Sequence, residues 1–168
     1  MKKFELTTES ITNAAGKKLF RIKALVEFGD VKAGELGGYV EKEGNVSQDG
    51  NAWVYGNAWV SGDARVSGDA WVSGDAWVYG NARVCGDAWV SGDADYTLIQ
   101  GFGTEFRCTT FYRGKNKKIM VNCGCFHGDL EGFRKQVKET RSGKIAKEYL
   151  MIADLMEYHF ASEDSDDE

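Results

Sequence analysis

The chain between residues 44 and 97 reads GNVSQD-GNAWVY-GNAWVS-GDARVS-GDAWVS-GDAWVY-GNARVC-GDAWVS-GDADYT, nine six-residue units without an interruption. A fixed short period indicates one structural unit that stacks on copies of itself. Six residues accommodate a strand of about four residues and one corner, since a strand rises roughly 3.3 Å per residue. The Gly-Asn or Gly-Asp pair of each unit supplies the corner, because these residue types tolerate left-handed backbone.

Small and large side chains alternate within each unit. Residues two apart lie on the same face of a strand, so Ala52 and Val54 share one face and Trp53 lies on the other. Small aliphatic side chains fill a narrow core, whereas tryptophan and arginine do not fit there. We therefore expect the large residues to face outward: Trp53, Trp59, Arg65, Trp71, Trp77, Arg83 and Trp89.

This pattern resembles the hexapeptide-repeat proteins, whose fold is a left-handed parallel β-helix with three hexads per coil. Their core pattern is an aliphatic residue, three variable residues and a small residue. Val54 to Ala58 fits it, and the fit recurs through Val90 to Ala94. The resemblance implies a mainly β protein in which residues 44–97 form about three coils. It is also the only source of the left-handedness, because ordinary parallel crossovers are right-handed.

Three hexads per coil place residues 18 apart on one face. The expected ladders are Trp53–Trp71–Trp89, Trp59–Trp77 and Arg65–Arg83. Five outward tryptophans are many for the surface of a monomer, and exposed apolar patches of this kind usually bind something. The alternative is that ladders of identical residues only stabilise the stack.

The segments that flank the hexads have other patterns. Residues 1–43 contain strand-like runs and predict a β-rich N-terminal cap, which an open stack of strands needs to protect its edge. Residues 98–161 predict a small ββαα module, with a hairpin of 104–112 and 118–125 followed by helices from Asp129 to Arg141 and from about Lys144 to Phe160. The acidic residues 162–168 predict a disordered tail.

Nearly the whole chain is similar to a group of phage and prophage proteins. The shared stretches are LFRIKALVEFGDVKAGELGGYVE (19–41), GNAWVYGNA (50–58) and VNCGCFHGDLEGFRKQVKET (121–140). The resemblance implies an accessory protein of a bacterial virus, made in the host cytoplasm, and brings no activity with it. We expect a non-enzymatic homo-oligomer, trimer first and dimer second, that captures a host protein or a small ligand. A counter-defence role rests on analogy alone.

Two other classes of function stay open. One is a purely structural, self-associating component. The other is a hexapeptide-type acyltransferase that lacks the usual histidine. The enzymes of that family need a histidine base or, in the carbonic anhydrases, three histidines around zinc, yet the two histidines here, His127 and His159, lie beyond the hexads. We therefore expect no catalytic residues and no cofactor.

The cysteines suggest a weaker metal hypothesis. If Arg113 pairs with Lys118, Cys108 lies opposite Cys123, and Cys123, Cys125 and His127 alternate onto one face of a strand. Three thiols and an imidazole are a ligand set for zinc. However, extended residues two apart hold their sulfurs too far apart for easy tetrahedral binding, and cysteine is commonly buried. We expect structural cysteines and no metal.

Arg65 and Arg83 carry like charges on neighbouring strands, which repel each other. Either Asp63, Asp69 and Asp87 at the corners neutralise them, or an anion such as a phosphate lies between them. Arginine beside flat aromatic rings is typical of phosphate binding and base stacking. Residues 44–97 have a net charge of −5, which disfavours long nucleic acid. If the protein binds a small molecule, we expect an anionic, partly aromatic one such as a nucleotide, held by these two arginines and the five tryptophans.

The remaining features concern the compartment. No apolar run reaches the length that spans a membrane, and the N-terminus lacks the apolar stretch of a signal peptide. Four cysteines in a chain of 168 residues do not suggest a secreted disulfide scaffold. We expect a cytoplasmic protein with reduced thiols and no membrane partner.

Overall fold

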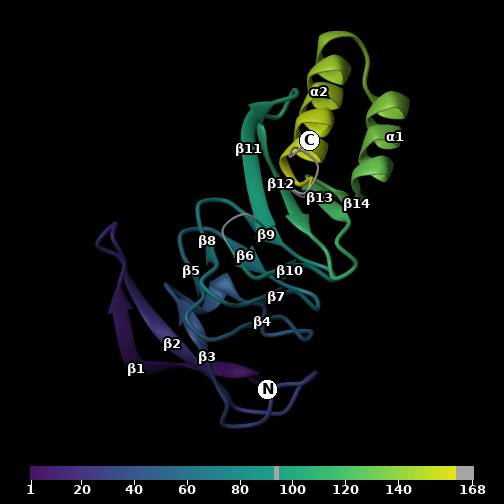
Figure 1. Ribbon diagram of the computed structural model, residues 1–168. Helices are drawn as coiled ribbons and strands as arrows, with labels where there is room; N and C mark the ends of the chain where they lie inside the picture. Colours follow the sequence, from purple (N-terminus) through teal and green to yellow (C-terminus); the bar gives the residue numbers. More distant parts are fainter. Residues whose placement is uncertain (93–94, 162–168) are drawn as a thin grey trace, which may run out of the picture.

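A computed structural model of the chain describes residues 1–92 and 95–161. The hexads form a stack of short parallel strands between an N-terminal β-rich cap and a C-terminal module of strands and helices (Figure 1). Two predictions lie outside the described residues. They are the disordered tail, 162–168, and the end of the hexad pattern at Ala94. No helix in the described ranges is long and apolar enough to cross a membrane.

The hexad strands are two residues long, and each carries one large residue and one valine. They are β4 (Trp53–Val54), β5 (Trp59–Val60), β6 (Arg65–Val66), β7 (Trp71–Val72), β8 (Trp77–Val78), β9 (Arg83–Val84) and β10 (Trp89–Val90). Strands 18 residues apart pair in parallel, in the orders β4-β7-β10, β5-β8 and β6-β9. Tryptophan thus stacks on tryptophan and arginine on arginine. The expected 18-residue spacing is confirmed.

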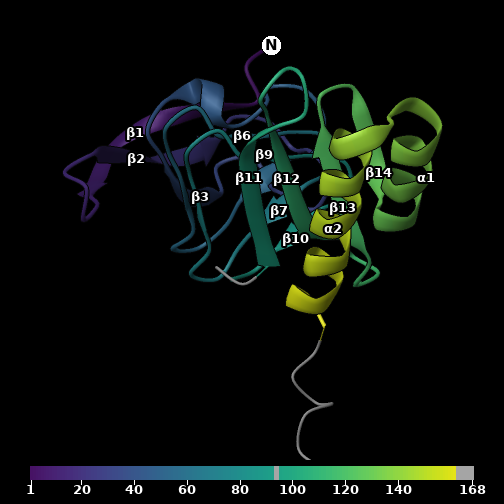
Figure 2. The same ribbon diagram turned by 90° about the horizontal axis from the view of Figure 1, so that it is seen from above.

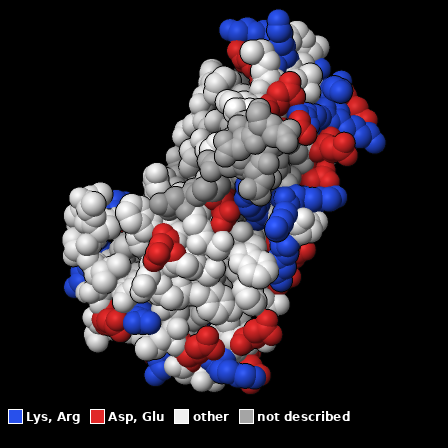
Figure 3. Space-filling view, in the orientation of Figure 1, with Lys and Arg blue, Asp and Glu red and all other residues white. Residues whose placement is uncertain are grey.

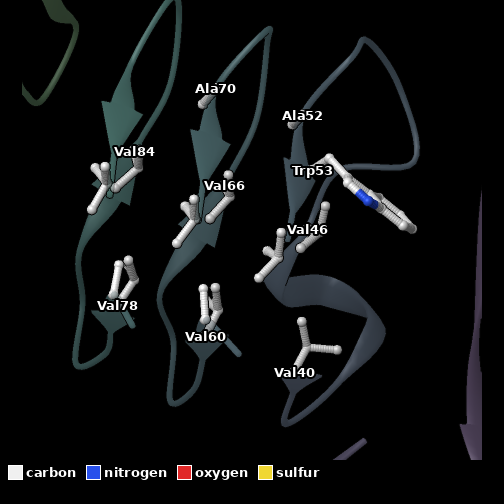
Figure 4. Close-up of a cluster of buried hydrophobic side chains, with 14 of the residues drawn as sticks. Val40, Val46, Ala52, Trp53, Val60, Val66, Ala70, Val78 and Val84 are labelled. Carbon is white, nitrogen blue, oxygen red and sulfur yellow. The ribbon is translucent and has the colours of Figure 1, made fainter. Parts of the chain in front are cut away.

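The valines and alanines of the hexads make the core of the stack. Val54, Val60, Val66, Val72, Val78, Val84 and Val90 are all fully buried, as the alternation predicts. The drawn valines of this cluster face one another across the core, while Trp53 points away from them (Figure 4). The corners need glycine, since Gly56 and Gly62 have φ angles of 58° and 67°.

The N-terminal cap is antiparallel and continues into the stack. It consists of β1 (Phe4–Thr12), β2 (Lys18–Ala24) and β3 (Leu36–Val40), and the short 3-10 helix η1 (Glu43–Asn45) leads into the hexads. β3 pairs in parallel with β5, with Tyr39 opposite Trp59. A methyl group on Gly38 would clash with the carbonyl oxygen of Ala58. Glycine at this position therefore lets the cap lie close to the first coil.

The cap also hides one of the tryptophans. Trp53 has no exposed surface and packs edge-on against Phe4 and Phe28, with ring centroids 5.9 Å and 5.3 Å away. Its Nε1 atom is buried and has no hydrogen-bond partner in the structure described. The expectation that Trp53 lies on an exposed face is wrong, because the side chain points out of the core but under the cap.

The C-terminal module has four antiparallel strands in chain order, β11 (Tyr96–Phe102), β12 (Arg107–Arg113), β13 (Ile119–Cys123) and β14 (Phe126–Asp129). The helices α1 (Leu130–Thr140) and α2 (Gly143–His159) pack beside this sheet, on the side away from the coils (Figure 2). The sequence predicts two strands before the two helices, and this prediction is wrong, because the structure has four. β11 was not predicted, and the expected strand 118–125 divides at Gly124, whose φ is 62°.

The helices of the module agree with the sequence. Asp129 accepts a hydrogen bond from the backbone N–H of Gly132, as an N-cap residue does. Leu130, Phe133 and Val137 of α1 are buried against the sheet and α2. The second helix begins at Gly143 and ends at His159, within one residue of the expected bounds.

Candidate ligand-binding site on the arginine face

Arg65 and Arg83 stack on each other in the β6-β9 pair, and both side chains are exposed. Neither guanidinium makes an ion pair with a carboxylate in residues 1–92 and 95–161. The corner carboxylates bind elsewhere: Asp63 accepts from Nζ of Lys42 at 2.8 Å, and Asp69 accepts from Nδ2 of Asn51 at 2.8 Å. The Lys42 hydrogen bond is the main cause that lowers the pKa of Asp63. No corner carboxylate of the described residues thus makes an ion pair with either arginine, although the charge of Arg65 contributes to the lowered pKa of Asp63.

Two clefts adjoin this pair and share Arg83 and Asn122. The smaller has a volume of about 240 Å³ and is lined by Gly44, Ser47, Arg65, Val66, Ser67, Arg83, Cys85 and Asn122. The larger, of about 650 Å³, is lined by Asp63, Asn81, Arg83, Gln100, Phe106, Arg107, Cys108, Asn122 and Gly124. We call the surface that these residues form the arginine face. It joins the coils to the C-terminal sheet.

Hydrogen bonds fix β9 and the residues after it against the sheet. The backbone N–H of Arg83 donates to Oγ1 of Thr110 at 3.0 Å. The hydroxyl of Tyr112 donates to the carbonyl oxygen of Cys85 at 2.9 Å and lies 2.9 Å from Nε2 of His127. These contacts hold the two sides of the arginine face at a fixed separation, which favours a preformed binding surface.

The thiol of Cys85 is a structural group within this junction. Nδ2 of Asn122 donates to its sulfur at 3.2 Å. Burial raises the pKa of Cys85 and, more strongly, that of the neighbouring Tyr112. The thiolate is the nucleophilic form of cysteine. A thiol with a raised pKa therefore does not supply a nucleophile at neutral pH.

Most residues of the arginine face were not predicted from the sequence, among them Phe106, Arg107 and Asn122. Phe106 has a φ of 49°, in the left-handed region that non-glycine residues seldom adopt, and its side chain is 66% exposed. Arg107 begins β12 and, like the two coil arginines, makes no ion pair with any described carboxylate. No sequence signal marks these residues, because their position depends on how the C-terminal sheet packs against the coils.

The tryptophans lie on other faces of the stack. Trp59 stacks on Trp77, with ring centroids 5.0 Å apart and planes inclined by 27°. Trp71 packs between Tyr55 and Trp89, with centroid distances of 5.1 Å and 5.9 Å. None of the five tryptophans lines either cleft of the arginine face. Trp89 lines a different cleft, together with Arg113 and Lys115.

One face of the coils carries few charges. In the view of Figure 3, a broad uncharged area covers the coils, and lysines and arginines gather along one margin and on the C-terminal module. Lys115 lies at the edge of the Trp71 ladder, with its Nζ 5.3 Å from the centre of the Trp71 ring. On another side of the stack, formed by β5 and β8, Trp77 and Tyr79 are 44% and 54% exposed, so that side presents aromatic surface.

The cysteines and His127 do not have the arrangement on which the metal hypothesis depends. Arg113 pairs with Ile119, and Thr109 rather than Cys108 lies opposite Cys123. The chain turns at Gly124 and Cys125, so that His127 is on the next strand, opposite Asn122. His127 meets Tyr112 on the coil side of the sheet, whereas Cys123 lies on the helix side with Thr109. The prediction that Cys123, Cys125 and His127 share one face is wrong.

The described part of the chain offers no other metal site. There, no group of three or more histidine, cysteine, aspartate or glutamate residues lies close enough together to hold a metal ion. Cys108 lines the larger cleft of the arginine face instead.

Among known protein families, a similarity is found for the repeat alone. No curated protein matches the chain. Three overlapping stretches, residues 58–74, 64–80 and 76–92, match the family model of the YdcK β-solenoid repeat. The matched residues run from the corner before β5 to the end of β10 and include neither the cap nor the C-terminal module. Residues 58–92 are therefore similar to a β-solenoid repeat, in agreement with their parallel, 18-residue pairing.

Proposed function

We propose that this protein is a non-enzymatic binding protein that takes a small phosphate-bearing ligand, such as a nucleotide, on the arginine face. One observation carries the proposal. Arg65, Arg83 and Arg107 gather around two adjoining clefts, and in the described structure none of them pairs with a carboxylate. A bound anion would relieve their mutual repulsion.

The chemistry of the clefts suits a nucleotide. A guanidinium group presents a planar fork of donors that matches phosphate oxygens and binds them in a bidentate manner. The amide side chains of Asn81, Gln100 and Asn122 line the same clefts and offer both donors and acceptors. The exposed ring of Phe106 provides a surface on which a base can stack, worth about 1–3 kcal/mol.

Calorimetry with a panel of nucleotides tests this function. Arg65→Gln and Arg83→Gln should each weaken binding by about tenfold or more, since a hydrogen bond to a charged group contributes about 1.5–3 kcal/mol. Added salt should weaken it further. Arg134→Gln is the matched control, because Arg134 already pairs with Asp154 and Glu157 on α2. Absence of heat with every nucleotide, in a folded and assembled protein, would reject the nucleotide and leave a protein partner or a structural role.

We also propose that the protein forms a homo-oligomer, trimer first and dimer second, through the exposed aromatic face of the stack. The exposed Trp77 and Tyr79 support this. The helix α2 also carries exposed apolar residues: Met151, Leu155 and Tyr158. Light scattering should show the oligomer for the unchanged protein and a smaller species for Trp77→Ser with Tyr79→Ser. Leu25→Ser, at another exposed apolar residue, is the control. A monomeric unchanged protein would contradict the proposal.

The similarity to hexapeptide-repeat and phage proteins supports the finer parts of the proposal. These are a left-handed parallel β-helix of about three coils, a cytoplasmic location and capture of a host protein or nucleotide signal. Native mass spectrometry before and after incubation with a host lysate distinguishes the cases. Co-purified nucleotide or a defined host protein favours capture, whereas a bare oligomer favours the structural alternative.

A further inference from the structure

A separate cavity lies in the C-terminal module, between the sheet and the two helices. Its volume is about 90 Å³. Its apolar lining consists of Phe102, Phe126, Phe133, Val137 and Tyr149. Phe133 is the centre of this lining, with its ring centroid 5.6 Å from that of Phe126 and 5.8 Å from that of Tyr149. The cavity is thus built from the core of the module and lies apart from the coils.

Charged residues gather at the same cavity. Arg107, Arg141 and Glu105 line it, which leaves a net charge of +1. Neither arginine makes an ion pair in the described ranges. Burial raises the pKa of Tyr149, and the positive charges of Arg141 and Arg107 act in the opposite direction. The hydroxyl of Tyr149 donates to the carbonyl oxygen of Phe102 at 3.2 Å, so it is already occupied.

We propose that this cavity binds a small carboxylic acid with a branched or compact apolar body, with its carboxylate at Arg141 and Arg107. The volume of the cavity limits the size of the apolar part of the ligand. A cavity that holds benzene measures about 150 Å³, and a single water needs about 10–15 Å³, so 90 Å³ accommodates a body of about four carbons. The aromatic and aliphatic walls favour that body over water, and the guanidinium groups favour a planar carboxylate.

The proposal does not rest on nucleotide binding at the arginine face, although Arg107 lines both places. Arg141 and Thr140 line only the cavity of the module, whereas Arg65 lines only the arginine face. These residues therefore separate the two sites in an experiment.

Calorimetry of the full chain with isovalerate is the first test. Isovalerate should bind, whereas isovaleramide, which lacks the charge, and acetate, which lacks the apolar body, should bind at least about tenfold more weakly. Arg141→Gln should weaken isovalerate binding by a similar factor. Thr140→Phe should abolish it by filling the mouth from an exposed position, and Arg65→Gln should leave it unchanged. Circular dichroism checks that each variant is folded.

Alkylation of the thiols gives a second, independent measurement. Cys123 and Cys125 line the cavity, whereas Cys85 and Cys108 line the arginine face. Bound isovalerate should slow iodoacetamide modification of the first pair and leave the second pair unaffected, as read by mass spectrometry of the peptides. Equal rates at all four with and without isovalerate, together with no heat, would overturn the proposal. Binding lost in Arg65→Gln but kept in Arg141→Gln would also overturn it.

Discussion

Replacing Trp53 and Trp89 by alanine compares two tryptophans of one ladder in different surroundings. A buried tryptophan side chain removes about 200 Å² from water, which at about 25 cal/mol per Å² corresponds to ~5 kcal/mol. Trp53 is fully buried under the cap, so Trp53→Ala should lower the free energy of unfolding by about 3–5 kcal/mol. Trp89 is 44% exposed, so Trp89→Ala should lower it by about 2–3 kcal/mol.

Trp53→Phe should behave differently from Trp53→Ala. The Nε1–H group of Trp53 is buried without a hydrogen-bond partner among the described residues, which costs about 1–3 kcal/mol. Phenylalanine removes this group and loses only about 50 Å² of buried area, or ~1 kcal/mol. The two effects oppose each other, and we expect a change of no more than about 1 kcal/mol in the free energy of unfolding.

Urea unfolding followed by far-UV circular dichroism measures all three variants, with a common slope as the check for two-state behaviour. Equal losses in Trp53→Ala and Trp89→Ala would refute the reasoning, because they would mean that the cap does not cover Trp53. A loss in Trp53→Phe as large as that in Trp53→Ala would show that the buried N–H group carries no cost.

Three further predictions test the core, the cap and a buried charge. Val72→Asp should abolish the folded state, because an unpaired charge in a dry core costs many kcal/mol; unchanged melting by circular dichroism would contradict the buried stack. Gly38→Ala should cost about 1–3 kcal/mol in urea unfolding, whereas Gly44→Ala, with no atom within 4 Å of the added methyl, should cost much less; similar losses would argue against close packing of the cap. Burial lowers the pKa of Lys3 from 10.5 to about 8, opposed by Asp49. Between these values the unfolded chain holds a proton that the folded chain releases, so stability should rise with pH across that window relative to Lys3→Met. Denaturation at pH 7 to 10 measures this, and parallel curves for the two proteins would refute it.

The sequence predicted the parts of the fold that repeat or have a local cause. The period of six, with its small and large residues, was enough to place the valines inside and to pair strands 18 apart. The bounds of α1 and α2 followed from Asp129 and from apolar residues at helical spacing. In each case the signal lies in neighbouring residues or in exact repetition.

The errors concern contacts between segments that are far apart in the sequence. Trp53 and Trp89 occupy equivalent positions in their units. Only Trp53 is covered by the N-terminal cap, which packs Phe4 against its ring. The strand pattern of 118–125 predicts that Gly124 lies inside a strand, but a glycine there is also typical of a turn, and the structure has a turn. The arginine face was predicted in part, since Arg65 and Arg83 follow from the period, while Arg107 and Asn122 come from the sheet that packs beside β9.

The pairing of strands 18 residues apart has a consequence for changes in chain length. Insertion or loss of 18 residues adds or removes one full layer and leaves every ladder in line with its neighbours. Loss of a single hexad instead shifts every later unit to the next face, so that tryptophans would continue an arginine ladder and the C-terminal module would leave its present side of the stack. The stack therefore tolerates growth in whole layers, and its three faces keep their identities only when length changes in multiples of three hexads.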